Sequence, residues 1–193
     1  MTCRARRPPA QLAPGGGLGY AASMLSVVIE THNDAEALAR TLAGLVPGAV
    51  EGVIREVIVC DKGSTDQTRR VAEDAGCRVL ADGGIAAAVS LARADWLLLL
   101  EPGARLGEGW IDAISAHLAG PAGAARFSRA RSARTPFFRR SLAGNRALAQ
   151  GLLIGKRQAA ALAARAASAE ALARGLATRL LPAEILVAPR AGK

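Results

Sequence analysis

The stretch at residues 56–68, EVIVCDKGSTDQT, joins a short apolar run directly to a polar loop. Short runs rich in β-branched residues that end at turn-forming residues are typical of strands buried on both faces of a sheet. Asp61 closes the run, where burying a carboxylate is costly unless the group has a partner or a ligand. Ser64 and Gln67 then form a capping-box pattern, which predicts a helix that ends at Gly76.

The same order of strand, polar loop and helix recurs on both sides of this stretch. Leu25–Glu30 is a second buried run, and Asn33 with Glu36 predicts the cap of a helix that ends at Pro47-Gly48. Further strands are expected at Arg78–Ala81 and Asp95–Leu100, and further helices between Gly84 and Ala94 and at Trp110–Leu118. Strands that alternate with helices predict right-handed βαβ units, and hence an α/β fold with a mostly parallel sheet.

The pattern weakens after Leu118. We expect an Arg-rich loop over residues 120–145, a strand at Gln150–Gly155 and a last strand at Glu184–Val187. Two segments are helical by composition, so this C-terminal part is expected to be short and helical: Arg157–Ala167 and Glu170–Leu180. Ligands of parallel α/β sheets bind beyond the carboxyl ends of the strands. The candidate site segments are therefore 30–34, 60–66 and 101–105.

The charge of the chain is high and unevenly spread. The net charge is +9, and no Asp or Glu occurs between Ala113 and Ala169. This asymmetry favours an anionic partner such as phosphate, an acidic membrane surface or nucleic acid, although a compositional bias toward Arg and Ala explains part of it. Three cysteines without metal-ligand spacing indicate a reduced, cytoplasmic setting. Apolar runs such as Trp96–Leu100 are too short to cross a bilayer, and the first residues lack the apolar core of a secretory signal.

Three stretches together resemble the family 2 glycosyltransferases with the GT-A fold. They are SVVIETHND at 26–34, EVIVCDKGSTDQT at 56–68 and ADWLLLLEPGARLGEGW at 94–110. Their order and separations are similar to the family's "VVIPTYN"-like opening, "VDDGSTD"-like loop and "DAD"-like motif after an apolar strand. The resemblance covers about Leu25 to Leu118 and is most specific in the middle stretch. It implies a Rossmann-like sheet flanked by helices and a binding site for a nucleotide-sugar donor.

The first two motifs imply which residues would hold the nucleotide of the donor. By this resemblance, Thr31 and His32 would lie near the base, with His32 standing where the family usually has an aromatic residue. Glu36 resembles the acidic residue that often follows the Asn, and Asp61 would contact the nucleoside. Lys62 replaces an acidic or amide residue, and it would either draw the diphosphate inward or point into solvent.

The third motif implies a divalent-metal site, and here the sequence departs from the family. Two carboxylates separated by one residue would hold Mg²⁺ or Mn²⁺ on the diphosphate, but these positions read Glu101-Pro102-Gly103. Glu101 would supply a single ligand, and hard cations need several oxygen ligands, so metal binding is expected to be weak. The phosphate charge would then be neutralised by Lys62, Arg105 or later Arg residues, because residues 83–90 carry no charge.

A general base would have to come from the second half of the chain. After Asp112 the only carboxyl side chains are those of Glu170 and Glu184, and Glu170 falls about where the family places its base. Glu170 is therefore the candidate catalytic residue. The alternative is structural, because a carboxylate is also favoured at the N-terminus of a helix by the helix dipole.

We expect residues 1–23 to be a disordered leader, residues 24–118 to bind the nucleotide-sugar, and residues 119–193 to complete the same domain with an Arg-rich loop and acceptor-side helices. The primary hypothesis is a cytoplasmic glycosyltransferase, peripheral to the inner face of the membrane if its unknown acceptor is lipid-linked. Two alternatives stay open. One is a non-catalytic nucleotide-sugar-binding or regulatory relative. The other is a membrane- or nucleic-acid-binding protein that uses the Arg-rich segment, which is the least favoured because it leaves Asp61 unexplained.

The Arg-rich segment combines basic and aromatic side chains. Its members are Arg126, Phe127, Arg129, Arg131, Arg134, Phe137, Phe138, Arg139 and Arg140. Arg binds phosphate groups well, so contact with the donor or with an anionic lipid carrier is the preferred functional interpretation. A solvated loop without a ligand is the alternative.

Overall fold

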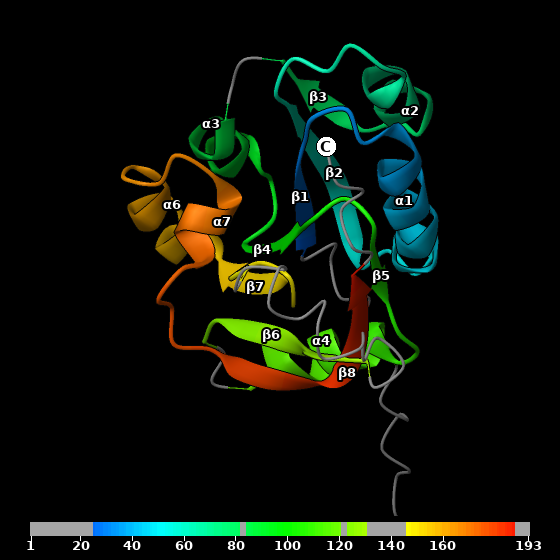
Figure 1. The fold of residues 1–193 in the computed structure, drawn as a ribbon. Coiled ribbons are helices and arrows are strands. Elements are labelled where there is room, and N and C mark those ends of the chain that lie inside the picture. The colour runs from blue at the N-terminus through cyan, green and yellow to red at the C-terminus, as the bar shows by residue number, and fades with distance from the viewer. Residues whose placement is uncertain (1–24, 82–83, 121–122, 131–145, 188–193) are drawn as a thin grey trace, which may run out of the picture.

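The computed structural model describes residues 25–81, 84–120, 123–130 and 146–187, which form an α/β fold around one eight-stranded sheet (Figure 1). The fold class expected from the sequence is confirmed. The expected leader, residues 1–23, and most of the Arg-rich segment, residues 131–145, lie outside the described residues.

The first half of the sheet is parallel, as the sequence predicts. Its strands are β1 (Leu25–Thr31), β2 (Ile54–Asp61), β3 (Arg78–Leu80) and β4 (Trp96–Leu100). β1 lies between β2 and β4 and pairs with both in parallel, so that Thr31 faces Asp61 and Ile29 faces Leu100. The carboxyl ends of these strands therefore lie at one edge of the sheet, which is where a ligand site is expected.

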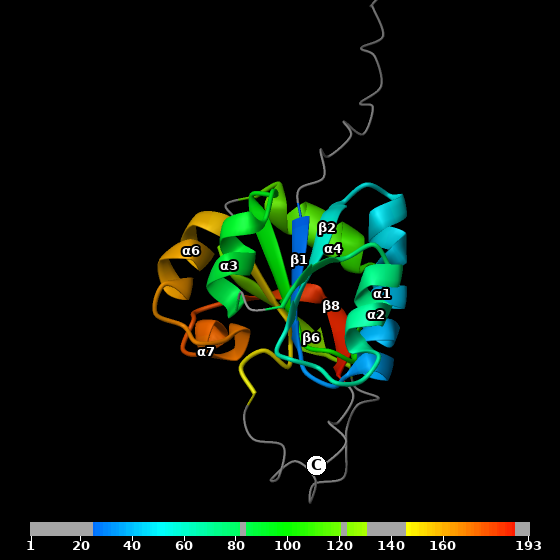
Figure 2. The same cartoon turned by 90° about the horizontal axis from the view of Figure 1, so that it is seen from above.

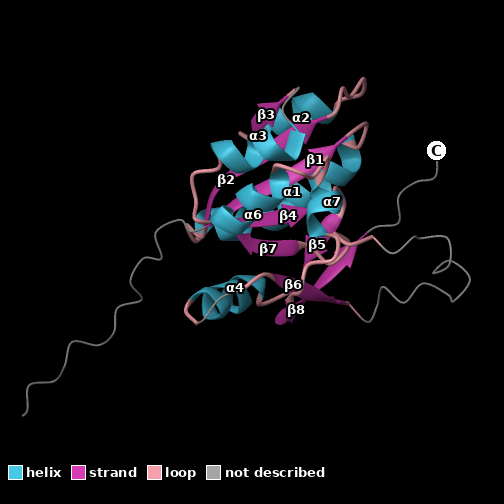
Figure 3. Ribbon diagram, turned by 90° about the vertical axis from the view of Figure 1, so that its left-hand side faces the viewer, coloured by secondary structure: helices cyan, strands magenta, loops and turns pink. Residues whose placement is uncertain are grey.

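The second half of the sheet is mixed in direction. Its strands are β5 (Ala104–Leu106), β6 (Ala125–Arg129), β7 (Leu152–Gly155) and β8 (Arg179–Val187). β7 pairs antiparallel with β4, and the whole sheet runs in the order β3-β2-β1-β4-β7-β6-β8-β5. Figure 3 shows the strands following one another from β3 to β8. The C-terminal part of the chain thus contributes strands as well as helices: β7 and the end of β8 lie where strands are expected, whereas β6 and the start of β8 do not.

Six helices of the described residues cover the two faces of the sheet (Figure 2). One face carries α1 (Ala35–Val50), α2 (Thr68–Asp74) and α4 (Trp110–Leu118), and the other carries α3 (Gly84–Leu91), α6 (Lys156–Ala163) and α7 (Ala169–Ala173). In β1, Val27 and Ile29 pack in the first layer and Val28 packs in the second. Each is fully buried, and such burial contributes roughly 1.5–3 kcal/mol per side chain.

Two strands lie where the sequence predicts a loop or a helix. β6 falls inside the expected Arg-rich loop, and Phe127 at its centre is fully buried. β8 replaces the end of the helix expected over Glu170–Leu180, since α7 has only five residues. Leu181, Ala183 and Ile185 are buried at every second position, which is the period of a strand. Tertiary packing of this short alternation outweighs the helical composition of the preceding residues.

The helix α1 continues past Pro47-Gly48, where the sequence predicts its end. Pro47 lacks an N–H and so removes one helical hydrogen bond. The Glu51 N–H nevertheless donates to the Pro47 carbonyl at 2.9 Å and closes the last turn. Gly48 is buried because the ring of Trp110 from α4 packs against it, leaving no room for a side chain. Packing against α4, rather than a turn, requires the glycine.

Substitution of Gly48 tests this packing. A Gly-to-Ala change inside a helix normally stabilises a protein by roughly 0.5–1 kcal/mol. At Gly48 the added methyl group would meet the Trp110 ring, and overpacking costs about 1–3 kcal/mol. We therefore expect Gly48→Ala to lower the free energy of unfolding measured in urea. Gly44→Ala is the control, because no atom lies near its added methyl group, and it should raise that free energy. Equal effects of the two substitutions would contradict the packing argument.

Candidate functional site

The loops after β1 and β2 are hydrogen-bonded to each other at the carboxyl edge of the sheet. The Asn33 N–H donates to Ser64 Oγ at 2.9 Å, and the Asn33 side-chain oxygen accepts from the Thr65 N–H at 2.8 Å. The Asp34 N–H donates to Thr68 Oγ1 at 2.9 Å. Asn33 has a φ of 54°, a left-handed conformation in which Asn is enriched. The two loops therefore form one unit.

These contacts replace the two capping boxes predicted from the sequence. Asn33 does not cap α1, because Asp34 occupies the N-cap position and the Asn33 side chain binds the neighbouring loop. Ser64 does not cap α2, whose N-cap residue is Gln67. The sequence shows the right polar residues, but their hydrogen bonds are made between loops rather than within each helix end.

Asp61 ends β2 with a side chain that is buried rather than turned into solvent. Its carboxylate accepts hydrogen bonds from the Ser64 N–H, at 3.1 Å, and from the Ser64 hydroxyl. Asp66 acts in a similar way further along the loop, where hydrogen bonds from the Thr68 side chain and from backbone N–H groups hold the pKa of Asp66 below its ordinary value. Both carboxylates thus stabilise the shape of the loop after β2.

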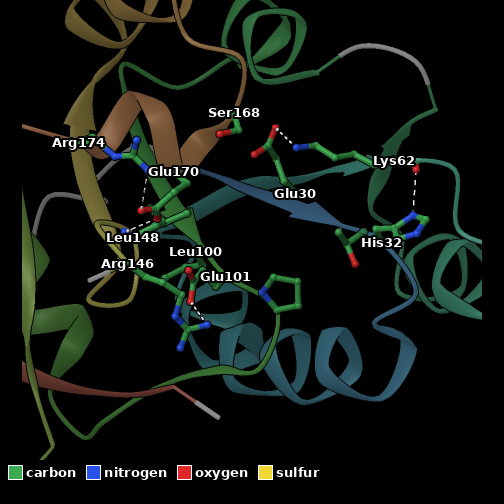
Figure 4. Close-up of a pocket in the computed structure, with 12 residues that line it drawn as sticks. Glu30, His32, Lys62, Leu100, Glu101, Arg146, Leu148, Ser168, Glu170 and Arg174 are labelled. Atoms are coloured by element: carbon green, nitrogen blue, oxygen red, sulfur yellow. Dashed lines mark hydrogen bonds and ion pairs between the residues drawn. The ribbon is translucent and has the colours of Figure 1, made fainter. Parts of the chain in front are cut away.

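A pocket of about 500 Å³ opens at the carboxyl ends of β1 and β4 (Figure 4). β1 continues through α1 to β2 on one side, whereas β4 pairs with β7 on the other, so the pocket lies at a switch point of the sheet. One side is lined by residues from the three motifs: Thr31, His32, Lys62, Glu101 and Pro102. The other side comes from the second half of the chain: Arg146, Leu148, Ser168, Glu170 and Arg174.

Three carboxylates line this pocket, and each one is paired with a cation (Figure 4). The pairs are Glu30 with Lys62 at 3.3 Å, Glu101 with Arg146 at 3.2 Å, and Glu170 with Arg174 at 3.9 Å. The charges of these six groups cancel when all are ionised. The pocket therefore contains many charged groups, but the charges of these three pairs add up to zero.

Glu30 joins parts of the chain that are distant in sequence. One carboxylate oxygen lies against Lys62, and the other accepts a hydrogen bond of 2.6 Å from the Ala169 N–H at the start of α7. The Glu30 side chain is only 11% exposed. A charged residue at the end of a buried strand was visible in the sequence, but its partner lies 139 residues away. The candidate segment 30–34 thus includes Glu30, but sequence reasoning gave this residue no role of its own.

Glu170 has the structural role that the sequence offers as the alternative to catalysis. One of its oxygens accepts from the Ala147 N–H at 2.7 Å, and the other accepts from the Leu148 N–H at 2.9 Å. It lies in the first turn of α7, after the N-cap Ser168. Glu170 also lines the pocket, as the base hypothesis requires. Its structural role is thus directly visible, whereas its catalytic role stays a prediction.

The pocket includes some of the predicted site residues and not others. Thr31, His32, Lys62, Glu101 and Glu170 line it, while Asp61, Glu36 and Arg105 do not. The Glu36 side chain is 84% exposed and pairs with Arg40, and Arg105 is exposed on the edge strand β5. Conversely, Arg146, Ser168 and Arg174 line the pocket although no motif marks them.

The residues around Glu101 do not fit a bound divalent metal. A hard cation takes several oxygen ligands, and the residues that the structure describes contain no group of three His, Cys, Asp or Glu side chains suited to a metal. The Glu101 carboxylate lies 3.2 Å from the Arg146 guanidinium. Glu30 and Glu170 each accept backbone N–H groups and face their own cations. A metal would therefore find one carboxylate, already in contact with a positive charge.

Two further polar candidates have structural roles. Burial raises the pKa of the Cys60 thiol to about 12, so this core residue is neutral at ordinary pH. Arg126, the first residue of the Arg-rich segment, donates to the Ala173 carbonyl at 2.6 Å.

Within the described ranges, no helix has the length and apolarity that a membrane crossing needs.

Comparison with known proteins gives a family match over the first half of the chain. Residues 26–102 match the family described as Glycosyl transferase family 2. A validoxylamine A glucosyltransferase from Streptomyces hygroscopicus subsp. limoneus is 36% identical over 129 residues, which cover 58% of this chain and 28% of that protein. The chain thus spans little more than a quarter of the length of this curated relative.

Solved structures support the same fold. Mannosyl-3-phosphoglycerate synthase from Rubrobacter xylanophilus aligns with a TM-score of 0.51 at 18% identity, covering 70% of this chain and 54% of that one. Glucosyl-3-phosphoglycerate synthase from Mycobacterium tuberculosis, solved with Mn²⁺, uridine diphosphate and phosphoglyceric acid, aligns with a TM-score of 0.50 at 19% identity, covering 77% and 63%. These likenesses establish an architecture similar to that of GT-A glycosyltransferases.

The structural role of Glu170 predicts a loss of stability on its removal. Glu170→Ala leaves the Ala147 and Leu148 N–H groups without their acceptor, and an unsatisfied backbone group costs about 1–3 kcal/mol. We expect the free energy of unfolding in urea to fall by about that amount. Glu184→Ala, at an exposed position of β8, removes the same charge and should change stability by less than about 0.5 kcal/mol. Indistinguishable stabilities of the two variants would refute the structural role.

Proposed function

We propose that the chain, whose residues 26–102 match Glycosyl transferase family 2, binds a nucleotide-diphosphate sugar and transfers the sugar to an acceptor hydroxyl. One observation carries the proposal: the three motifs of the domain meet in a single pocket. Thr31 and His32 come from the first motif, Lys62 from the second and Glu101 from the third. The pocket also has the volume and the position that ligand sites of α/β sheets have.

A uridine diphosphate donor has the best support among nucleotide-sugars. The matched relative from Streptomyces hygroscopicus is named a glucosyltransferase, and the solved synthase from Mycobacterium tuberculosis binds uridine diphosphate. UDP-glucose is therefore the first donor to test. Because the chain spans only part of these proteins, the donor and the activity are proposals for it.

In this proposal the nucleotide binds at the first two loops. Thr31 and His32 lie at the end of β1, where a base would enter, and the His32 ring is held by its Nδ1 at 2.9 Å from the Lys62 carbonyl. Asp61 acts through Ser64 by fixing the loop that carries Lys62. The Lys62 ammonium would stabilise charge that develops on the diphosphate as it leaves.

Glu170 is the proposed general base. Its carboxylate would take the proton of the acceptor hydroxyl while the hydroxyl oxygen attacks the anomeric carbon and the nucleoside diphosphate leaves. The position of Glu170 on the opposite side of the pocket from Lys62 suits an acceptor that enters from the second half of the chain (Figure 4). A lipid-linked, anionic acceptor would agree with the Arg-rich segment, whose residues 131–145 lie outside the described part.

A second candidate function is a binding module without catalysis. One observation favours it: both oxygens of Glu170 accept hydrogen bonds from backbone N–H groups. This structural role accounts for the carboxylate at position 170 without any catalytic role. This candidate keeps the donor site and abandons only the transfer. Turnover of the donor therefore separates the two functions, whereas donor binding does not.

Donor binding is expected to depend on Asp61. Asp61→Ala removes the acceptor for the Ser64 N–H and hydroxyl, so the loop that carries Lys62 loses its shape. We expect the dissociation constant for UDP, measured by isothermal titration calorimetry, to rise at least about tenfold, or roughly 1.4 kcal/mol. Asp74→Ala, on the exposed side of α2, is the charge-matched control and should bind like the unmodified chain. Unchanged affinity in the Asp61 variant would remove Asp61 from the donor site.

Catalysis is expected to depend on Glu170 in a way that binding does not. Glu170→Gln keeps one oxygen acceptor but cannot take a proton, and a general base typically contributes 10²–10⁴-fold. With UDP-glucose and an acceptor mixture, we expect UDP release to slow at least about 100-fold while the affinity for UDP falls by less than about tenfold. Release at the unmodified rate would eliminate Glu170 as the base. Donor binding without any release in the unmodified chain would support the binding module.

A further inference from the structure

The guanidinium of Arg146 lies beside Glu101, the carboxylate of the third motif that a divalent metal would contact. Arg146 Nη1 lies 3.2 Å from a carboxylate oxygen of Glu101. Figure 4 shows the two side chains turned toward each other in the pocket wall. Resting on the proposed function, we propose that Arg146 binds the diphosphate of the nucleotide in place of a divalent metal, so that nucleotide binding does not require metal.

The guanidinium of Arg146 is held ready for an anion. Glu101 contacts it from one side, and the next two residues, Ala147 and Leu148, are anchored by their N–H groups to Glu170. The Arg146 side chain is 28% exposed, so it is largely packed but still reaches the pocket. Fixing a long side chain before binding reduces the entropy that binding must overcome.

The chemistry of a guanidinium suits a diphosphate. It carries five N–H donors in a planar fork, and a carboxylate can engage only part of that fork. The remaining donors match the spacing of two phosphate oxygens, which is why Arg recognises phosphate in a bidentate manner. Glu101 in this arrangement is a positioning residue that orients Arg146, not a metal ligand.

The other acidic groups of the pocket do not provide an alternative metal site. Glu30 is bonded to the Ala169 N–H and to Lys62, and Glu170 is bonded to the Ala147 and Leu148 N–H groups. A divalent cation at Glu101 would have to approach the Arg146 guanidinium, and the two like charges repel each other strongly in a partly buried pocket. The position after Glu101 is Pro102, which offers no side-chain oxygen.

The test measures UDP binding by isothermal titration calorimetry in two buffers, one with EDTA and one with Mn²⁺. The unmodified chain should bind UDP with dissociation constants that agree within about twofold in the two buffers. Arg146→Ala should weaken binding at least tenfold in both buffers, and Arg146→Lys, which keeps the charge but loses the fork, should lie between. Arg165→Ala is the charge-matched control, because Arg165 is exposed and outside the pocket, and it should bind normally.

Glu101→Gln distinguishes a Glu101 that orients Arg146 from a Glu101 that binds a metal, because the two roles predict different effects on UDP binding. If Glu101 orients Arg146, Glu101→Gln should change the dissociation constant for UDP by the same factor, within about twofold, with EDTA and with Mn²⁺. If Glu101 were a metal ligand, binding would weaken more than tenfold in Mn²⁺ alone. A tenfold gain of the unmodified chain on adding Mn²⁺, or normal binding by Arg146→Ala, would also overturn the inference while leaving the donor site in place. Failure of the unmodified chain to bind UDP or GDP in either buffer would instead overturn the proposed function together with the inference. Each variant must be folded like the unmodified chain, which its melting temperature checks. If Arg146→Ala does not fold, UDP binding by Arg146→Lys is used to test the inference instead.

Discussion

The carboxyl edge of the sheet depends on the parallel pairing of β1 with β2, which ends with Thr31 opposite Asp61. Because this register brings both strand ends to the same level, the following loops can exchange hydrogen bonds through Asn33 and Ser64. A slip of one residue would turn every side chain of β1 to the opposite face of the sheet and separate the two loops. The nucleotide side of the pocket is therefore a consequence of strand register, which the packing of β1 against helices on both faces of the sheet holds in place.

The antiparallel strand β7 completes the pocket from the other side. Leu99 of β4 lies opposite Leu152 of β7 in an antiparallel pair. The residues that precede β7 in the sequence therefore lie beside the carboxyl end of β4. This arrangement places Arg146 beside Glu101 and brings the Ala147 and Leu148 N–H groups within reach of Glu170. Strand direction, rather than a local motif, thus explains why residues 45 positions apart in the sequence form an ion pair.

Prediction of secondary structure from the sequence works best where residues close in the sequence determine the helix or strand. The four parallel strands and α4 follow from apolar runs and turn residues, and they are confirmed. Prediction fails where distant packing decides: α1 continues through Gly48, on which Trp110 packs, and Phe127 lies in β6, which pairs with β8. The same holds for the site, since Thr31 and Lys62 belong to motifs, whereas the contacts of Glu30 and Arg146 come from residues far along the chain. Composition cannot reveal such partners.

The departures from the family pattern at positions 62 and 101 look like separate losses in the sequence, but in the structure each of these residues belongs to a pair of opposite charges. Such pairs do not all have the same availability to a ligand. Glu30 is nearly buried and also holds α7, so its contact with Lys62 is part of the fold. The pair of Arg174 with Glu170 is the most exposed of the three on its cation, at 75%, and an exposed ion pair contributes only roughly 0–1 kcal/mol. Arg174 can therefore leave Glu170 for a phosphate at small cost, whereas Arg146 keeps its contact with Glu101 and offers its remaining N–H donors, so a pocket with balanced charge can still favour an anionic ligand.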